Sequence, residues 1–351
     1  MTNTVRAIGA TAEAAPLEPI DIVRRTPEAN DVRVAITHSG ICHSDIHTVR
    51  GEWGERPYPV VPGHEIVGTV LEVGSAVTRF NVGQTVGVGV IVDSCGTCPQ
   101  CLDHLECYCT GTGPRFTYAD PEPQMPGAFT YGGYAQEIVT AERFVYRIPE
   151  GLDLAGVAPL LCAGITVFSP LKHWGAGPGK TVAVAGIGGL GHLAVKFAHA
   201  LGAHTVAITS SEEKRDLCLK LGADEVLVSS DPAAMAASDS RFDIIISTLP
   251  SDHDMNPYIS LLALDGTYVV VGAVNDLNRP LTLPNLMMRR RSIGGSMIGG
   301  TVETQEMLDF CGTHGITADV EVVAADYVNQ AYDRVVAGDV AFRFVIDATT
   351  I

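Results

Sequence analysis

Short apolar stretches interrupted by polar residues fill the first part of the chain. Residues 66–73 (IVGTVLEV) and 82–92 (VGQTVGVGVIV) are two such stretches, and Gly or Asn lies beside each. Runs of this kind are typical of β-strands that bury one face. We therefore predict a β-rich domain over residues 1–157.

A different pattern begins near residue 180, where short apolar runs alternate with helical ones. Strands are predicted at 181–186, 204–209, 225–228, 242–248 and 267–271. Helices are predicted among them, at 190–201 and 212–221. Strands that are apolar on both faces and alternate with helices form a parallel sheet covered on both sides. The predicted fold class is α/β, with a doubly wound parallel-sheet domain over 158–296.

The last part of the chain, residues 297–351, carries one more helical pattern at 303–315 and an apolar strand at 342–347. We expect this part to return to the first domain. The length of 351 residues agrees with two domains, because it exceeds what one hydrophobic core usually organises.

The chain is acidic, with a formal net charge of −17. Nucleic acids and anionic membranes are bound mainly through an excess of Lys and Arg, so neither is an expected partner. The N-terminal residues lack the apolar core of a signal peptide, and no run approaches the roughly 18 apolar residues of a membrane span. We therefore expect a cytoplasmic protein.

Six of the nine cysteines, together with one histidine, fall into two patterns that suit zinc. The first pattern is C-x2-C-x2-C-x7-C, formed by Cys95, Cys98, Cys101 and Cys109. Four thiolates leave no open position on the metal, so this pattern predicts a structural zinc. Cys107 lies inside the same loop but off the spacing. Two disulfides are the alternative, although thiols stay reduced in the cytoplasm.

The second pattern consists of Cys42, His64 and Cys162, which lie far apart in the sequence. A zinc ion that takes part in catalysis keeps three protein ligands and an open fourth position. These three residues therefore predict a catalytic zinc, which gives two zinc ions per chain. Taken singly, each cysteine could instead be a buried apolar residue, and His64 a histidine of the core.

A glycine-rich motif, G-x-G-x-x-G, follows the predicted strand 181–186 and opens the helix after it. It consists of Gly186, Ile187, Gly188, Gly189, Leu190 and Gly191. Glycines at these positions permit a tight turn and a close approach to a pyrophosphate at the helix N-terminus. The sequence therefore predicts a dinucleotide site.

The residues after the second strand bear on which dinucleotide binds. An enzyme that uses NAD usually has Asp or Glu here for the ribose 2′-hydroxyl, but this chain has Thr209, Ser210 and Ser211, followed by Lys214 and Arg215. Small hydroxyls and cations favour the 2′-phosphate of NADP(H). The alternative is a solvated helix start with Ser211 as its N-cap.

Several motifs now occur in one order along the chain: GHEIVGTVLEVG, CGTCPQC, APLLCAGITVFSPL, AGIGGLGHLAVKFA and the terminal FRFVID. In these the chain resembles the zinc-dependent medium-chain alcohol dehydrogenases, and most closely their cinnamyl alcohol dehydrogenase branch. The resemblance runs nearly end to end. It implies a GroES-like catalytic domain, a Rossmann cofactor domain and a homodimer.

The resemblance also implies roles for residues around the catalytic zinc. Asp45 would orient the histidine ligand, and Glu65 would lie behind the metal as an occasional alternative ligand. Ser44 and His47 match the proton relay of the family, although His47 could be a plain surface histidine.

Further positions match contacts to cofactor and substrate. His43 and Arg343 match residues that contact the pyrophosphate, and Thr166 matches a position beside the nicotinamide. Residues that match the substrate pocket are Trp53, Met297 and Ile298, with Phe116 in a loop that could close over it. An apolar, partly aromatic pocket suits aromatic or medium-chain substrates, while Trp53 could equally be a packing residue.

We therefore expect a zinc-dependent oxidoreductase that transfers hydride between NADP(H) and primary alcohols or aldehydes. One alternative is a polyol or sugar dehydrogenase on the same scaffold, which would need more polar groups near the metal. Another is a zinc-free NADP-binding protein without catalysis, against which the Cys42, His64 and Cys162 set argues.

Overall fold

The computed structural model describes residues 2–249, 253–272 and 279–351, and the chain divides into two compact units. The first unit comprises Met1–Cys162 and Gly299–Ile351, and the second comprises Ala163–Ile298. The boundaries expected from the sequence lay earlier, at 157/158 and 296/297. The segment Ala158–Leu161 stays with the first unit because Leu161 packs into the space that Gly87 leaves open.

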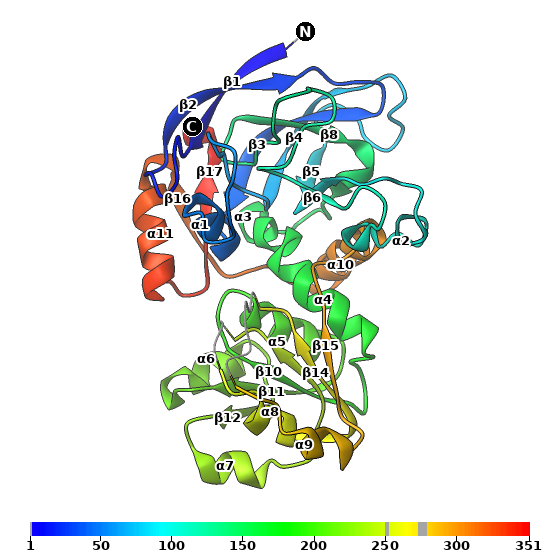
Figure 1. Ribbon diagram of the computed structural model, residues 1–351, viewed down its shortest axis with the longest axis vertical. Coiled ribbons are helices and arrows are strands. Elements are labelled where there is room, and N and C mark those ends of the chain that lie inside the picture. Colours follow the sequence, from blue (N-terminus) through cyan, green and yellow to red (C-terminus); the bar gives the residue numbers. More distant parts are fainter. Residues whose placement is uncertain (1, 250–252, 273–278) are drawn as a thin grey trace. The chain divides into compact units, whose positions relative to one another are not determined.

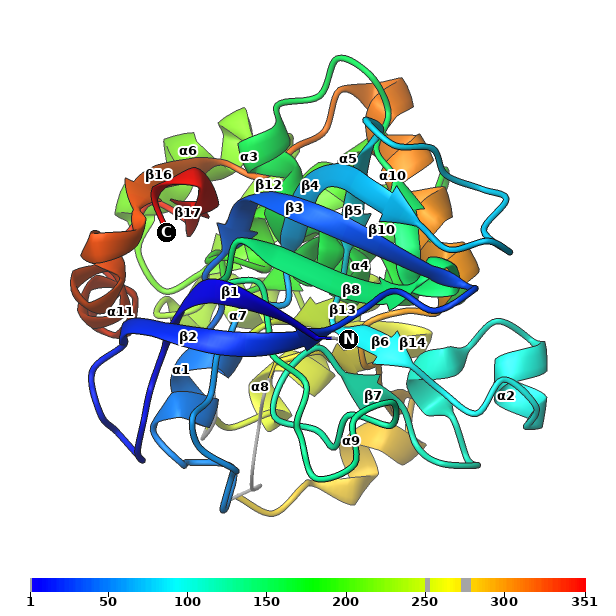
Figure 2. The ribbon, with the colours of Figure 1, turned by 90° about the horizontal axis from the view of Figure 1, so that it is seen from above.

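The first unit is organised by a seven-stranded sheet, whose strands β3, β4 and β8 lie side by side in Figure 2. The order is β16-β17-β3-β4-β5-β9. β17 pairs with the end of β3, and β8 pairs with its start. The strands are β3 (Asp31–Gly40), β4 (Ile66–Val73), β5 (Thr85–Val88), β8 (Glu137–Ala141), β9 (Val145–Arg147), β16 (Val320–Ala324) and β17 (Arg343–Asp347). The C-terminal strands thus lie beside strands from the start of the chain.

One strand expected in this unit is divided in the structure. The predicted strand 82–92 forms β5 and then β6 (Ile91–Asp93), which leaves the main sheet to pair with β7 (Arg115–Phe116). Gly89 lies between them, where a Cβ atom would come 3.0 Å from the carbonyl oxygen of Leu161. By contrast, the prediction of a strand at 66–73 is confirmed, since β4 has these bounds.

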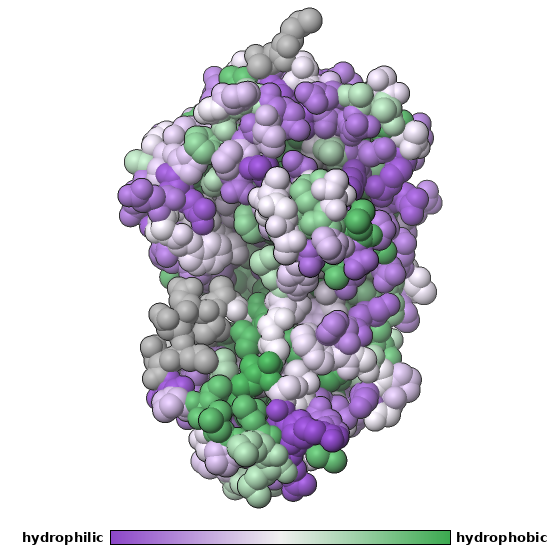
Figure 3. Space-filling view, turned by 45° about the vertical axis from the view of Figure 1, so that its right-hand side comes forward, coloured by the Kyte–Doolittle hydropathy of each residue, from purple (hydrophilic) through white to green (hydrophobic). Residues whose placement is uncertain are grey.

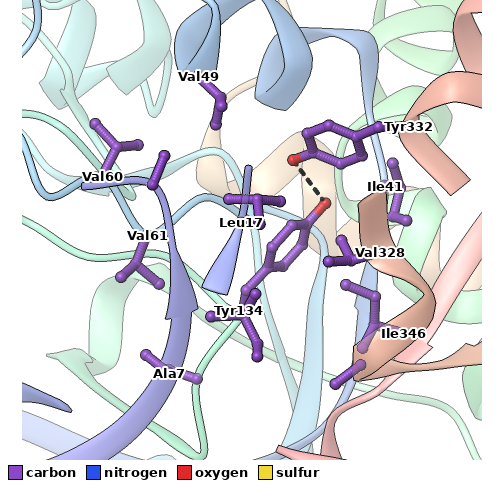
Figure 4. Close-up of a cluster of buried hydrophobic side chains, with 14 of the residues drawn as sticks. Ala7, Leu17, Ile41, Val49, Val60, Val61, Tyr134, Val328, Tyr332 and Ile346 are labelled. Atoms are coloured by element: carbon purple, nitrogen blue, oxygen red, sulfur yellow. Dashed lines mark hydrogen bonds between the residues drawn. The ribbon is translucent and has the colours of Figure 1, made fainter. Parts of the chain in front are cut away.

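A hairpin of β1 (Thr2–Gly9) and β2 (Glu18–Arg25) covers a second core of the first unit. This core also includes residues of α1 (His43–Val49), α11 (Val328–Ala337) and β17. Figure 4 shows apolar side chains of these elements around Tyr134 and Tyr332. The core therefore packs the first helix of the chain against its last helix.

The second unit is a six-stranded parallel sheet with helices on its faces, and five of its strands, β10, β11, β12, β14 and β15, are labelled in Figure 1. Its order is β12-β11-β10-β13-β14-β15, formed by β10 (Thr181–Ala185), β11 (His204–Thr209), β12 (Glu225–Val228), β13 (Phe242–Ser247), β14 (Leu262–Val270) and β15 (Ser292–Gly295). The helices are α4 (Ala163–His173), α5 (Gly191–Ala200), α6 (Arg215–Lys220), α7 (Pro232–Ala237), α8 (Asn256–Ser260) and α9 (Leu283–Met287). This order is that of a Rossmann fold, and ligands bind where it reverses, between β10 and β13.

Most elements predicted for the second unit are confirmed within a few residues. β11 and β12 have the expected bounds, and α5 is one residue shorter at each end than the helix predicted at 190–201. The helix predicted at 212–221 begins instead as a 3₁₀ turn, Glu212–Lys214, before α6.

Among the described residues, no single helix is long and apolar enough to cross a membrane. The bent pair Leu154–Leu161 and Ala163–His173 passes the same test only when its two parts are joined. The first part holds α3 (Leu154–Val157), and most of both parts is buried in the protein.

The loop of four cysteines is attached to the first unit through α10 (Thr301–His314). This loop contains α2 (Pro99–Leu102) and a 3₁₀ turn, Glu106–Tyr108. The buried Glu106 carboxylate accepts from the backbone N–H of Thr301 at 3.0 Å and from its hydroxyl at 2.9 Å. Gly300 lets the loop approach, because a Cβ atom there would lie 1.7 Å from the carbonyl oxygen of His104. The loop therefore caps the helix.

Replacing Glu106 with Ala leaves a buried N–H group of α10 without a partner. We expect this to lower the free energy of unfolding by about 1–3 kcal/mol. Differential scanning calorimetry would measure the change, with Glu150→Ala, at an exposed position, as the control. An E106A transition at the temperature of the control would contradict the capping role.

Candidate functional site

Four buried side chains from separate parts of the first unit meet at one point. They are Cys42, His64, Glu65 and Cys162, whose possible ligand atoms all lie within 4.8 Å of one another. Cys42 precedes α1, His64 and Glu65 precede β4, and Cys162 follows Leu161 at the end of the first unit. The structure thus brings together the three residues that the sequence grouped as a catalytic zinc site.

Asp45 fixes two of these residues. Its carboxylate accepts from the N–H of Cys42 at 2.9 Å and from Nδ1 of His64 at 3.1 Å. Because the Nδ1–H of His64 donates a hydrogen bond to Asp45, Nε2 is the nitrogen free to act as a ligand. That atom is buried and has no partner at hydrogen-bonding distance among the described residues. A metal ion at this point would satisfy it.

The charges around the cluster also suit a cation. The hydrogen bond shared with Cys162 lowers the pKa of the Cys42 thiol well below its ordinary value. Burial opposes the charged form of His64, but the Asp45 carboxylate outweighs it and raises the pKa of His64. Burial raises the pKa of Glu65 to about 7, although its buried partner Arg343 favours the carboxylate. Two thiols and a carboxyl group in one dry place are typical of a site that a divalent cation neutralises.

The second cysteine cluster has the geometry of a closed metal site. The sulfur atoms of Cys95, Cys98, Cys101 and Cys109 lie within 4.8 Å of one another. The N–H groups of Thr97 and Cys98 are directed at Cys95, and they lower the pKa of its thiol to about 7. The N–H of Cys101 does the same for Cys98, whose pKa is about 5. Such N–H bonds stabilise thiolates, the form that binds zinc.

All nine cysteines are free thiols in the structure, so the disulfide alternative finds no support. Cys107 is buried away from the four clustered sulfurs, and burial raises its pKa to about 12. Its thiol therefore stays protonated, in contrast to those of Cys95 and Cys98.

The residues expected to form a proton relay lie on and near α1. The Ser44 hydroxyl is 3.6 Å from the sulfur of Cys42 and so lies next to the first cluster. His47 pairs through Nδ1 with Glu52, and its ring stacks on Trp53 at a centroid distance of 5.0 Å. The ring of His43 is 6.1 Å from that of His47. Trp53 therefore packs against His47, a role that the sequence did not predict.

The glycine-rich motif lies at the end of β10, where the strand order of the second unit reverses. Gly186 has a φ of +90°, and a Cβ atom on Gly191 would lie 1.9 Å from the carbonyl oxygen of Gly186. The turn thus needs glycine at both positions. A Cβ atom on Gly188, by contrast, would meet nothing within 4 Å, so this glycine leaves room beside the loop. A pyrophosphate could approach the backbone there.

In the segment after β11, the role of Ser211 as an N-cap is compatible with a 2′-phosphate site. The hydroxyl of Ser211 accepts from the N–H of Glu213 at 3.2 Å, which makes it an N-cap, as the alternative predicted. Arg215 pairs with Glu212 and is thereby neutralised. Lys214 instead extends to the glycine-rich loop, where Nζ is 3.4 Å from the carbonyl oxygen of Ile187. Of these two cations, Lys214 is the one that contacts the glycine-rich loop.

The remaining predicted residues are distributed over both units. Thr166 is buried in α4, and Arg343, which was expected at the pyrophosphate, is buried and paired with Glu65. Trp53 and Phe116 in the first unit, and Met297 in the second, are partly exposed apolar side chains. Ile298 is buried and has a φ of +43°, a strained conformation for a β-branched residue.

Sequence reasoning missed several residues that support the site. Tyr134 donates to Asp45 at 3.3 Å, and Glu52 and Glu106 make the contacts described above. His192 directly follows the glycine-rich motif, and its Nδ1 lies 3.1 Å from the carbonyl oxygen of Gly188. The place of His192 beside the motif was an available signal, whereas nothing near Tyr134 in the sequence pointed to Asp45.

Comparison with known proteins places this geometry in one family. Residues 28–150 match the alcohol dehydrogenase GroES-like domain, and residues 189–313 match the zinc-binding dehydrogenase family. The aldehyde reductase YahK of Escherichia coli (strain K12) is 54% identical over 349 residues, with 99% of each chain covered. The chain belongs to the zinc-dependent medium-chain alcohol dehydrogenase family. The expected GroES-like and Rossmann fold is thereby confirmed.

Solved structures agree over nearly the whole chain. A cinnamyl alcohol dehydrogenase of Sorghum bicolor has a TM-score of 0.94 and 44% identity, and the match covers 99% of this chain and 98% of that one. The CAD of Helicobacter pylori, solved in complex with NADP(H), has a TM-score of 0.91 and 36% identity, covering 99% of both chains. The resemblance to the cinnamyl alcohol dehydrogenase branch is thus confirmed as well.

Two glycine substitutions separate folding from nucleotide binding. We expect Gly191→Ala to destabilise the second unit by several kcal/mol, because the new methyl group would overlap a backbone oxygen. Gly188→Ala should leave thermal unfolding near wild type and weaken dinucleotide binding about tenfold or more, because its methyl group occupies the space beside the loop. Calorimetry and fluorescence titration with NADPH would measure the two effects. Equal NADPH affinity of G188A and wild type would contradict the placement of the pyrophosphate.

Proposed function

We propose that the protein is a zinc-dependent oxidoreductase that transfers hydride between NADP(H) and primary alcohols or aldehydes, aromatic or medium-chain aliphatic. The observation that supports this most is the buried Cys42, His64 and Cys162 cluster with an unpartnered Nε2. The family and the aldehyde reductase and cinnamyl alcohol dehydrogenase names of its relatives support the same activity.

In this proposal the first unit holds two zinc ions and the second binds the nucleotide. Cys42, His64 and Cys162 hold the catalytic zinc, and the four cysteines of the loop hold a structural zinc. A zinc ion bound by three protein ligands acts as a Lewis acid that polarises a carbonyl and lowers the pKa of an alcohol. Glu65, which is paired with Arg343, belongs to the same cluster and would be an alternative ligand.

The proton of the reaction is carried by Ser44 and His47. Ser44 lies beside Cys42, where its hydroxyl can donate to the substrate oxygen. The pairing of Nδ1 of His47 with Glu52 leaves Nε2 to exchange a proton at the other end of the relay. Asp45 takes part only by orienting His64.

The nucleotide is held by the glycine-rich loop and the segment after β11. The loop and the N-terminus of α5 suit the pyrophosphate. His43 and Arg343 as further contacts, and Thr166 beside the nicotinamide, rest on the resemblance to the family alone, and Arg343 is already paired with Glu65. Ser210, Ser211 and Lys214 bind the 2′-phosphate of NADP(H), a preference that agrees with the relative solved with NADP(H). For the substrate, the resemblance to the family implies Trp53 and Phe116 of the first unit and Met297 and Ile298 of the second, and their apolar character suits an apolar substrate.

We also propose a homodimer. β15 is an edge strand of its sheet, so one of its sides is available for pairing. Figure 3 shows a patch of apolar residues on the face that it draws. In the second unit, Leu283, Met287 and Met288 of α9 and its end are among the most exposed apolar side chains. Sedimentation velocity at the mass of one chain would contradict the dimer. Nine free thiols suit a reducing compartment, which supports the cytoplasm.

Removing a ligand from each cluster tests the two zinc ions and their roles. Elemental analysis should find two zinc ions per chain in the wild type and one in both Cys162→Ala and Cys98→Ala. C162A should show no measurable turnover while NADPH binding is retained, because its glycine-rich loop is unchanged. C98A is the matched control for losing a zinc ligand elsewhere. Turnover by C162A would contradict the zinc mechanism.

Replacing Lys214 with Ala tests the 2′-phosphate contact. We expect kcat/KM for NADPH to fall about tenfold, which corresponds to about 1.4 kcal/mol, while kcat/KM for NADH stays unchanged. Lys220→Ala, an exposed lysine at the end of α6, is the control for the change in charge. Equal losses with both cofactors would mean that Lys214 does not read the phosphate.

A further inference from the structure

The Asp45 carboxylate has a donor for nearly every lone pair. Oδ1 accepts from the N–H of Gly63 at 3.0 Å and from Nδ1 of His64 at 3.1 Å. Oδ2 accepts from the N–H of Cys42 at 2.9 Å and from the Tyr134 hydroxyl at 3.3 Å. Each oxygen thus has two of these donors, and the Tyr118 hydroxyl also bonds to the same carboxylate. Together these bonds prevent the carboxylate from rotating away from His64. Asp45 itself is completely buried.

A second tyrosine stands behind the first. The Tyr332 hydroxyl donates to the Tyr134 hydroxyl at 3.4 Å, the contact drawn as a dashed line in Figure 4. Tyr332 belongs to α11, near the C-terminus, whereas Tyr134 lies in the segment before β8. Burial raises the pKa of both tyrosines well above the ordinary value, so both hydroxyls keep their protons and donate. Because Tyr332 donates to Tyr134, it leaves the proton of Tyr134 for Asp45.

The segment that carries Tyr134 is itself held against the segment that carries His64. The N–H of Tyr134 donates to the carbonyl of Pro62 at 3.0 Å, and that of Gly133 to Gly63 at 2.8 Å. The buried Arg24 of β2 donates to the carbonyls of residues 131 and 132, at 2.5 and 2.8 Å. The position of Tyr134 relative to His64 is therefore fixed by backbone contacts as well as by its hydroxyl.

We propose that Tyr134 and Tyr332 are positioning residues of the catalytic metal site, because their hydroxyls form a chain from α11 to Asp45 that holds His64 in its metal-binding orientation. The inference rests on the proposed function. The Tyr134 hydroxyl is the part of this side chain that bonds to Asp45, while its ring packs in an apolar core. The last helix of the chain thereby contributes to a metal site whose ligands all lie before residue 163.

The rate at which zinc leaves the protein tests this role directly. Zinc transfer to a coloured chelator in excess should proceed in two phases, and the phase that is missing in C162A identifies the catalytic ion. We expect Tyr134→Phe to speed this phase about tenfold or more, as is common for residues that orient a metal-bound histidine. Tyr332→Phe should speed it less, by about threefold, because it acts through Tyr134. The phase of the structural ion should not change.

Tyr146→Phe is the matched control, since Tyr146 is a buried tyrosine of the same unit that is bonded to Thr304. It should leave both phases at the wild-type rate. If Y134F does not fold, Y332F is used for the test instead. The Tyr332 hydroxyl bonds to the Tyr134 hydroxyl and not to Asp45 itself, so its removal should disturb the fold less.

A double mutant separates positioning from general destabilisation. If the two hydroxyls act as one chain, Y332F should have no further effect once Tyr134 is Phe, so the double mutant releases zinc at the rate of Y134F. Multiplying effects would mean that each tyrosine only stabilises the fold.

The outcomes also distinguish this inference from the proposed function. A wild type that binds no zinc at the first cluster would overturn both. A wild type that binds two zinc ions, with Y134F and Y332F releasing the catalytic ion as slowly as Y146F, would overturn only the role of the tyrosines.

Discussion

One buried carboxylate, that of Asp45, holds together the cluster that contains Cys42 and His64. Asp45 binds the N–H that precedes α1, the N–H of Gly63 and Nδ1 of His64, and so joins two segments that are separate in the sequence. Asp45 is the residue to which both Cys42 and His64 are hydrogen-bonded. The carboxylate also decides the tautomer of His64, which leaves Nε2 as the ligand atom. The positions of the other ligands are set by the fold around it.

The two units contribute by different physical means. In the first, thiols, a histidine and a carboxyl group are brought together in a buried cluster that a divalent cation would suit. In the second, small residues keep the backbone accessible, with Gly186 in a turn and Gly188 beside open space. The structural cysteine loop serves a third purpose, because Glu106 ties it to the start of α10. The buried cluster, the open backbone of the glycine-rich loop and the capping contact of Glu106 thus depend on different residues of the same chain.

Patterns in the sequence predicted the features that depend on interactions between neighbouring residues. The spacing of the loop cysteines, the glycine-rich motif and the bounds of β4, β11 and β12 all follow from neighbouring residues. The sequence could not predict Tyr134 and Tyr332 as partners, because nearly two hundred residues separate them and a tyrosine in a core is normally explained by packing. The division of the strand at 82–92 was missed for the same reason, since it depends on Leu161 and on pairing with β7.

The account depends on a zinc ion at the Cys42, His64 and Cys162 cluster being required for turnover, and metal replacement tests this most directly. Initial rates of NADPH oxidation with cinnamaldehyde would be measured for the metal-free protein and after stepwise return of zinc. We predict no turnover without metal and activity that rises with occupancy of this cluster. A metal-free protein that reduces the aldehyde at the rate of the zinc-loaded one would contradict the account.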